Sequence, residues 1–150
     1  MKLTRTLFCS ITLASGFSAP ALAALGGDAA SVEADRASLN GALRVSASDS
    51  FTLHEIQTPG GLTVHEYLSP QGKVFAVSWR GRGIPDLRQM LGSYYGQLEQ
   101  ATSVPHRDHH HLAVQTPELV VQARGHVRAY SGRAWVPTLL PQNFLVSQIN

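Results

Sequence analysis

One short turn, residues 58–61 (Thr-Pro-Gly-Gly), constrains the fold of this chain more than any other part of the sequence. It separates two segments, 50–57 and 62–68, that are rich in β-branched, aromatic and leucine side chains. A glycine-containing turn between two such segments is typical of a β-hairpin. The sequence therefore predicts an antiparallel pair of strands here, and with it a fold built on a sheet.

The charges of this hairpin indicate the length of its loop. A two-residue loop would set Glu55 opposite Glu66, and like charges directly opposite each other destabilise a strand pair. A three-residue loop instead sets His54 opposite Glu66 and Glu55 opposite His65. We predict the three-residue loop, Pro59–Gly61, which also pairs Ile56 with Val64 and Leu53 with Tyr67.

Further strands are indicated on both sides of a helical region. Lys73 to Arg80 is apolar at odd and even positions alike, which is typical of a central strand, and alternation sets Phe75 and Trp79 on one face of it. Later strand-like segments are separated by turn residues such as Ser131-Gly132, and they are Leu112–Gln115, Glu118–Arg124, His126–Tyr130 and Arg133–Val136.

Two helices are predicted. Asp28 can cap a short helix that runs to Leu39. In the segment Pro85–Thr102, leucines and tyrosines recur at helical spacing, so we expect the main helix there. Gly92 and Gly96 lie one turn apart in it; because glycine lowers helix stability, we expect this flank of the helix to approach the sheet closely.

These elements predict an α+β fold. We expect a mostly antiparallel sheet of about six strands, in the order βββ-α-βββ, packed on the one main helix. The short N-terminal helix precedes the sheet and either docks loosely or serves as an arm. Small folds of a helix on a sheet often serve as binding modules, through a sheet edge or a groove between helix and sheet, although a fold does not define a function.

The first residues have the pattern of a secretory leader rather than of a folded element. Lys2 and Arg5 precede a mostly apolar run, Leu7–Leu22, and Ala21–Ala23 has the small residues of a cleavage site. The alternative, an uncleaved membrane anchor, needs about 20 predominantly apolar residues, and the run is shorter and interrupted by serines, Gly16 and Pro20. We predict a signal peptide over residues 1–23, cleaved after Ala23, and one domain over residues 24–150.

Removal of this leader has consequences for chemistry. Cys9 is the only cysteine, so the mature chain has no disulfide, thiolate metal site or cysteine nucleophile. The whole chain carries 12 Lys and Arg against 10 Asp and Glu. Lys2 and Arg5 leave with the leader, and the remaining charges balance. A protein that binds nucleic acid usually has a basic excess, so we expect neither a nucleic-acid partner nor a membrane span in the mature chain, and a periplasmic or secreted location.

A histidine cluster is the first candidate for chemistry. His106, His109, His110 and His111 lie within six residues, and neutral imidazoles bind zinc, copper or nickel. We take His106, His109 and His111 as candidate metal ligands, with Asp108 as a further oxygen donor. A firm site needs three or four converging ligands, so the alternatives are a solvated polar loop or weak, adventitious metal binding.

The hairpin holds the second candidate. His54-Glu55 and His65-Glu66 form a repeated pair, and a histidine beside a carboxylate can act in acid–base chemistry, as in a hydrolase. The alternative is an ordinary cross-strand polar contact. No nucleophile elbow, phosphate-binding loop or dinucleotide fingerprint accompanies the pairs. We therefore predict no catalytic residues and no cofactor.

Several segments together resemble a known family. They are Ala24–Gly27, the hairpin with His54-Glu55 and Glu66-Tyr67, the run Ser69–Trp79, and Pro85–Gly92. They are similar to short exported proteobacterial proteins described only as a domain of unknown function. The resemblance covers most of the chain after the leader. It implies export and a single domain, and it implies no activity, cofactor or catalytic residue.

The sequence favours a small, exported, non-enzymatic protein, a binding or accessory module of the cell envelope whose partner is an envelope protein or a small ligand. The alternatives are a metal-binding protein that uses the histidine cluster and a hydrolase that uses a His-Glu pair.

Overall fold

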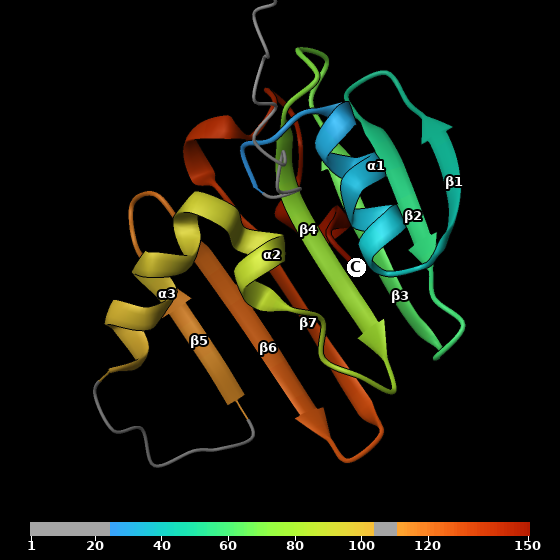
Figure 1. Ribbon diagram of the computed structural model, residues 1–150. Coiled ribbons are helices and arrows are strands. Elements are labelled where there is room, and N and C mark those ends of the chain that lie inside the picture. Colours follow the sequence, from blue (N-terminus) through green and yellow to red (C-terminus); the bar gives the residue numbers. More distant parts are fainter. Residues whose placement is uncertain (1–24, 104–110) are drawn as a thin grey trace, which may run out of the picture.

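The computed structural model describes residues 25–103 and 111–150. The predicted leader lies outside these residues. The described chain forms one seven-stranded antiparallel sheet with the strand order β1-β2-β3-β4-β7-β6-β5 (Figure 1). The strands are β1 (Ala42–Ala47), β2 (Thr52–Gln57), β3 (Leu62–Leu68), β4 (Val74–Gly81), β5 (His111–Gln115), β6 (Val120–His126) and β7 (Ala129–Trp135).

Short helices complete the fold. They are α1 (Ala29–Ser38), α2 (Leu87–Leu91) and α3 (Tyr95–Thr102), with the 3₁₀ turns η1 (Gly92–Tyr94), η2 (Pro137–Leu139) and η3 (Val146–Gln148). As predicted, Asp28 caps α1, because its carboxylate accepts hydrogen bonds from the amides of Ala30 and Ser31 at 3.0 and 3.1 Å. No helix among the described residues has the length and apolar character needed to cross a membrane.

The predicted fold class, a βββ-α-βββ sheet packed on one main helix, is wrong. Four strands precede the helical region and three follow it, and the protein is mostly sheet. The unpredicted strand is β1, an edge strand that pairs with β2 over its whole length. Its alternation is short and its residues are mostly Ala, Ser and Arg, so it carries little of the β-branched and aromatic signal that marks a strand.

The main helix is also broken into pieces. Gly92 adopts φ 51° and ψ −122°, a conformation that ends α2, and the chain turns through η1 before α3 begins. The close approach expected at Gly96 is wrong, because a Cβ added there would meet nothing within 4 Å. Glycine is needed at position 92 because of its backbone conformation, a requirement that the spacing of Gly92 and Gly96 does not indicate.

The hairpin prediction is confirmed. The main-chain amide of Thr58 donates to Leu62, which closes a three-residue loop at Pro59–Gly61. The register of β2 and β3 sets His54 opposite Glu66 and Glu55 opposite His65. It also pairs Ile56 with Val64 and Leu53 with Tyr67, as the charge argument required.

A bulge changes the faces of β4. The register between β3 and β4 shifts at Tyr67 and Leu68, so that Leu68 lies opposite Val74 while Tyr67 lies opposite Ala76. The extra residue moves Phe75 to the opposite side of the sheet from Trp79, which corrects the expectation that they share a face. The predicted break at Ser131-Gly132 is wrong too, since both residues lie inside β7.

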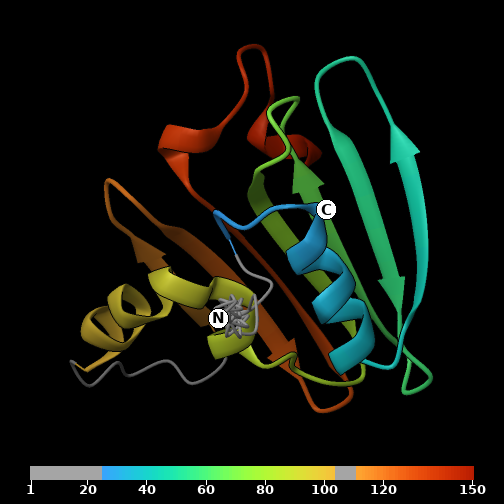
Figure 2. The same ribbon diagram turned by 45° about the horizontal axis from the view of Figure 1, so that its top comes forward.

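Helices and tail cover opposite sides of the sheet (Figures 1 and 2). We call them the helix face and the tail face. The helix face packs α1, α2 and α3 onto a core in which Val32, Val64, Val77, Leu91 and Val121 are almost wholly buried. On the tail face, residues 136–150 cross the sheet and bury Phe144 and Ile149 against Tyr67, Phe75 and Trp135. Because Val32 of α1 is buried in the core of the helix face, α1 is docked on the sheet and is not a loose arm.

Candidate functional site

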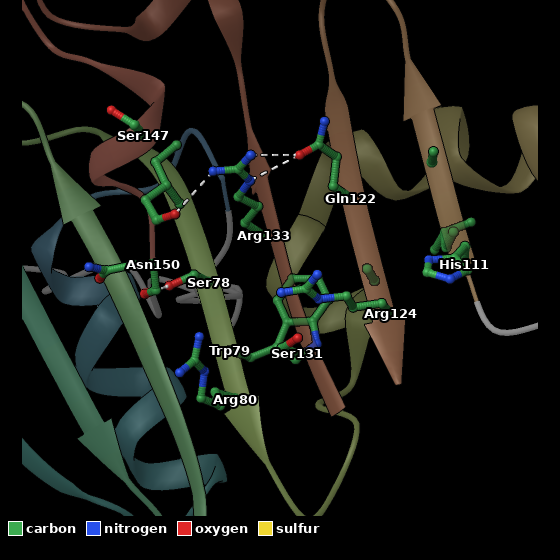
Figure 3. A pocket seen from close by; sticks show the side chains of 15 residues that line it. Ser78, Trp79, Arg80, His111, Gln122, Arg124, Ser131, Arg133, Ser147 and Asn150 are labelled. Carbon is green, nitrogen blue, oxygen red and sulfur yellow. Dashed lines mark hydrogen bonds between the residues drawn. The ribbon is translucent and has the colours of Figure 1, made fainter. Parts of the chain in front are cut away.

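The tail covers only part of its face, and the rest forms a pocket of about 570 Å³ that we call the open pocket (Figure 3). Its floor consists of two rows of side chains that run across neighbouring strands. One row holds Arg80, Ser131, Arg124 and His111, and the next holds Ser78, Arg133, Gln122 and Ala113. The second row continues through His65 and Glu55 of the hairpin.

Arg133 is the fixed centre of this pocket. Its Nε and one terminal nitrogen donate to the Gln122 side-chain oxygen at 3.0 and 2.8 Å. Its other terminal nitrogen donates to the main-chain oxygens of Val146 and Ile149 at 3.2 and 3.3 Å. Arg133 thus ties the tail to the sheet, and none of these partners carries a compensating negative charge.

Arg80 and Arg124 have exposed side chains and no hydrogen bond or ion pair to another residue of the described chain. Both are Cα partners of Ser131, one from β4 and the other from β6. In Figure 3 the Arg124 side chain extends from β6 toward Ser131 on the neighbouring strand. The pocket therefore holds two guanidinium groups whose donors are free to bind a ligand.

The lining of the open pocket is positively charged. Arg80, Arg124 and Arg133 line it, and no Asp or Glu of the described residues does. The balanced charge predicted for residues 24–150 does not reveal this local excess, because none of the described Asp and Glu side chains lines the pocket. An uncompensated cluster of guanidinium groups attracts anions and offers them several charge-assisted donors.

The end of the tail forms one wall of the pocket. Ser78 donates its hydroxyl to the main-chain oxygen of Asn150 at 2.6 Å, and Nδ1 of His65 lies 2.9 Å from the same oxygen. The other ring nitrogen of His65 lies 3.2 Å from the carboxylate of Glu55. The wall is thus held by polar contacts to β3 and β4, and the hairpin pair His65–Glu55 is part of that support.

Only one of the predicted metal ligands can be placed. His111 is exposed at the start of β5 and lines the open pocket beside Arg124. His106 and His109 lie outside the described residues. Among the residues that the structure does describe, no group of three or more His, Cys, Asp or Glu could hold a metal ion. The histidine cluster therefore stays a prediction.

The candidate acid–base pair His65-Glu66 is not brought together, whereas His65 makes the cross-strand contact with Glu55. Neighbouring residues of a strand point to opposite faces, so His65 lies on the tail face while Glu66 is buried on the helix face with 1 % exposure. There Glu66 meets Asp35 of α1. Burial, together with the nearby Asp35 carboxylate, raises the pKa of Glu66 to about 9. Because Glu66 is buried beneath α1, a substrate cannot reach its carboxyl group.

The arginines of the open pocket were missed from the sequence. Arg80 is the last residue but one of a buried strand, and Arg124 and Arg133 lie in segments that alternate only weakly. Alternation within each strand does place Gln122 and Arg124 on one face of β6, and Ser131 and Arg133 on one face of β7. What the sequence does not contain is the pairing of β4 with β7, which brings Arg80 into the same row.

Fold and site together define a small antiparallel-sheet protein, packed by helices on one face and carrying an open, basic pocket on the other. The chain belongs to the family described as "Protein of unknown function (DUF2844)", whose model matches residues 21–149. This confirms the resemblance to a domain of unknown function. No curated protein and no solved structure matches the chain.

Proposed function

We propose that this protein is an exported, non-enzymatic binding module that holds a small anionic ligand in the open pocket. The observation that supports this most directly is the lining, which contains Arg80, Arg124 and Arg133 and no acidic side chain of the described residues. The pocket volume of about 570 Å³ lies within the range of small-molecule sites. Export is supported by the leader pattern of residues 1–23.

The polar groups of the pocket favour binding over chemistry. Arg133 and Ser78 are occupied in holding the tail. His65, beside the pocket, is held between Glu55 and the main-chain oxygen of Asn150, and His111, which lines the pocket, has no described carboxylate or other hydrogen-bond partner to orient it as a general base. Arginine keeps its charge at all ordinary pH values and does not take part in proton transfer. What remains available to a ligand is a set of hydrogen-bond donors with positive charge.

A variant that fills the pocket tests this proposal. Ala113 is exposed on β5 and lines the pocket, so Ala113→Trp places an indole where the ligand would lie. Ala42→Trp is the matched control, because Ala42 is an exposed residue of the edge strand β1, outside the pocket. The three proteins are purified without a tag from the cells that produce them, and native mass spectrometry measures the mass of each.

We expect the wild type and Ala42→Trp to carry the same additional ligand mass, and Ala113→Trp to lack it. Equal ligand occupancy in all three proteins would contradict a site in the open pocket. Bare masses for the wild type and for Ala42→Trp would contradict a retained small ligand.

A further inference from the structure

Two free arginines flank one hydroxyl group in the open pocket. Arg80 on β4 and Arg124 on β6 are both Cα partners of Ser131 on the intervening strand β7. Hydrogen-bonded strands lie about 4.8 Å apart, so both arginines start from positions that are adjacent to Ser131. An arginine side chain is longer than this spacing, and both guanidinium groups can therefore reach an anion above the Ser131 hydroxyl.

The donors approach this point from three strands. Arg80 and Arg124 each offer a planar fork of N–H groups, which matches two oxygens of a phosphate or a carboxylate. The Ser131 hydroxyl, which makes no hydrogen bond to another described residue, adds a donor from the floor. A planar carboxylate has two oxygens and is satisfied by one fork. A tetrahedral oxyanion has three or four oxygens and can use all three groups at once.

The residues around this point add positive charge, and no described acidic side chain competes with a ligand for the arginines. Arg133 lies in the next row and is held by Gln122 and by the tail, so it adds a fixed positive charge. His111 ends the row of Arg124 on β5. No described Asp or Glu lines the pocket, so no described acidic side chain there pairs with the arginines.

From this geometry we infer that the open pocket selects a phosphate-type tetrahedral oxyanion, held by Arg80 and Arg124 above the Ser131 hydroxyl. The inference rests on the proposed function and names the chemical class of its ligand. A soluble phosphate monoester and the phosphate of a lipid headgroup share this chemistry, and the experiment separates the two sources.

The test is a titration of ¹⁵N-labelled protein at constant ionic strength, followed by amide chemical shifts. The probes are methyl phosphate, inorganic sulfate and acetate, and separately vesicles of phosphatidylglycerol or of phosphatidylcholine. The variants are Arg80→Gln, Arg124→Gln and Ser131→Ala. Arg82→Gln is the control, since Arg82 is an exposed arginine outside the pocket. The same spectra show whether each variant is folded.

We expect methyl phosphate and sulfate to give saturable shifts at Arg124, Ser131 and Gly132, with acetate binding more weakly. Loss of one charge-assisted contact should weaken methyl phosphate binding about tenfold or more in Arg80→Gln and Arg124→Gln. Arg82→Gln should leave it within about twofold. Binding to phosphatidylglycerol vesicles alone, lost in Arg124→Gln, would support the same oxyanion class with a lipid as its source.

Three outcomes would overturn the inference. They are an absence of saturable binding to methyl phosphate, sulfate and phosphatidylglycerol vesicles alike, a loss of binding in Arg82→Gln equal to that in Arg124→Gln, and acetate binding as tightly as methyl phosphate. If Ala113→Trp displaces a ligand whose binding Arg80→Gln and Arg124→Gln leave unchanged, the proposed function stands and the oxyanion assignment fails.

Discussion

Asp35 of α1 and Glu66 of β3 bury their carboxyl groups against each other, with 2 % and 1 % of each residue exposed. Gln89 of α2 donates its amide to Asp35, while neither oxygen of Glu66 has a donor from the described residues. Burial raises the pKa of Asp35, and burial with the Asp35 charge raises the pKa of Glu66 to about 9. A neutral Glu66 can donate to Asp35, and the pair then fastens α1 to the sheet as two carboxyl groups that share a proton.

Stability should therefore fall as pH rises. The unfolded chain releases the Glu66 proton near its ordinary pKa of 4.5, whereas the folded protein keeps it until about pH 9. Between these values the folded state binds one more proton, so the free energy of unfolding decreases by about 1.4 kcal/mol for each pH unit. His54, opposite Glu66, has its pKa lowered by burial and adds no positive charge there above neutral pH. Urea unfolding at pH values from 7 to about 9 measures this slope, because below that range the unfolded chain binds the His54 proton and the two effects oppose each other.

The variant Glu66→Gln keeps a donor for Asp35 and removes the titrating group. We expect its stability to change far less with pH between 7 and about 9, where Glu66 dominates. Glu118→Gln, at an exposed position, should keep the wild-type slope. A wild type as stable at pH 9 as at pH 7 would show that the two carboxyl groups do not share a proton.

Gly132 should tolerate no side chain. It lies inside β7 opposite Trp79, and a Cβ at this position would collide with the indole ring of Trp79. Because Trp79 is buried and cannot move freely, we expect Gly132→Ala to cost about 1–3 kcal/mol of stability. Gly83→Ala, where a Cβ would meet nothing within 4 Å, is the control. Denaturation followed by circular dichroism compares them, and equal losses would contradict the collision.

Arg133 should hold the tail through its shape as well as its charge. It donates to Gln122, Val146 and Ile149 at the same time, and lysine cannot reproduce this planar fork. We expect Arg133→Lys to speed amide hydrogen exchange in residues 144–150 at least tenfold, with β2 and β3 unchanged. Arg128→Lys, in the turn between β6 and β7, should leave the tail protected. Wild-type exchange in the tail of Arg133→Lys would show that apolar packing alone fixes it.

The predicted histidine site has its own test. If His106, His109 and His111 bind a metal together, His109→Ala with His111→Ala should weaken zinc binding about 100-fold or more, because two of three ligands are lost. Isothermal titration with zinc measures the affinity, and His126→Ala is the control for a histidine outside the cluster. Unchanged affinity in the double variant would end the metal-binding alternative.

The local parts of this fold could be predicted, and the assembly of those parts could not. Turn residues and opposing charges were sufficient for the register of β2 and β3, and Asp28 marked the start of α1. The alternation that would have revealed β1 is too weak in a short strand with only Leu43 and Val45 among Ala, Ser and Arg. The sequence predicts a turn at Gly132, because the structural requirement for glycine there, contact with the Trp79 ring, comes from a distant strand.

The same limit applies to the candidate site. The chemistry of histidines and carboxylates can be recognised in a sequence, yet His65 and Glu66 point to opposite faces of the sheet. The arginines of the open pocket carry no local motif. They become a site only through the order of the strands, in which β7 lies between β4 and β6.

That strand order also divides the protein into two sequential halves. Strands β1 to β4 form one meander, β5 to β7 form another, and within the sheet the two are joined only where β4 pairs with β7. Arg80 and Arg124 lie on either side of this seam. An anion that binds both arginines would connect the two halves, which come from separate stretches of the chain. Bound ligand would therefore raise the melting temperature. The rise in melting temperature would then measure how far the ligand stabilises the pairing of β4 with β7.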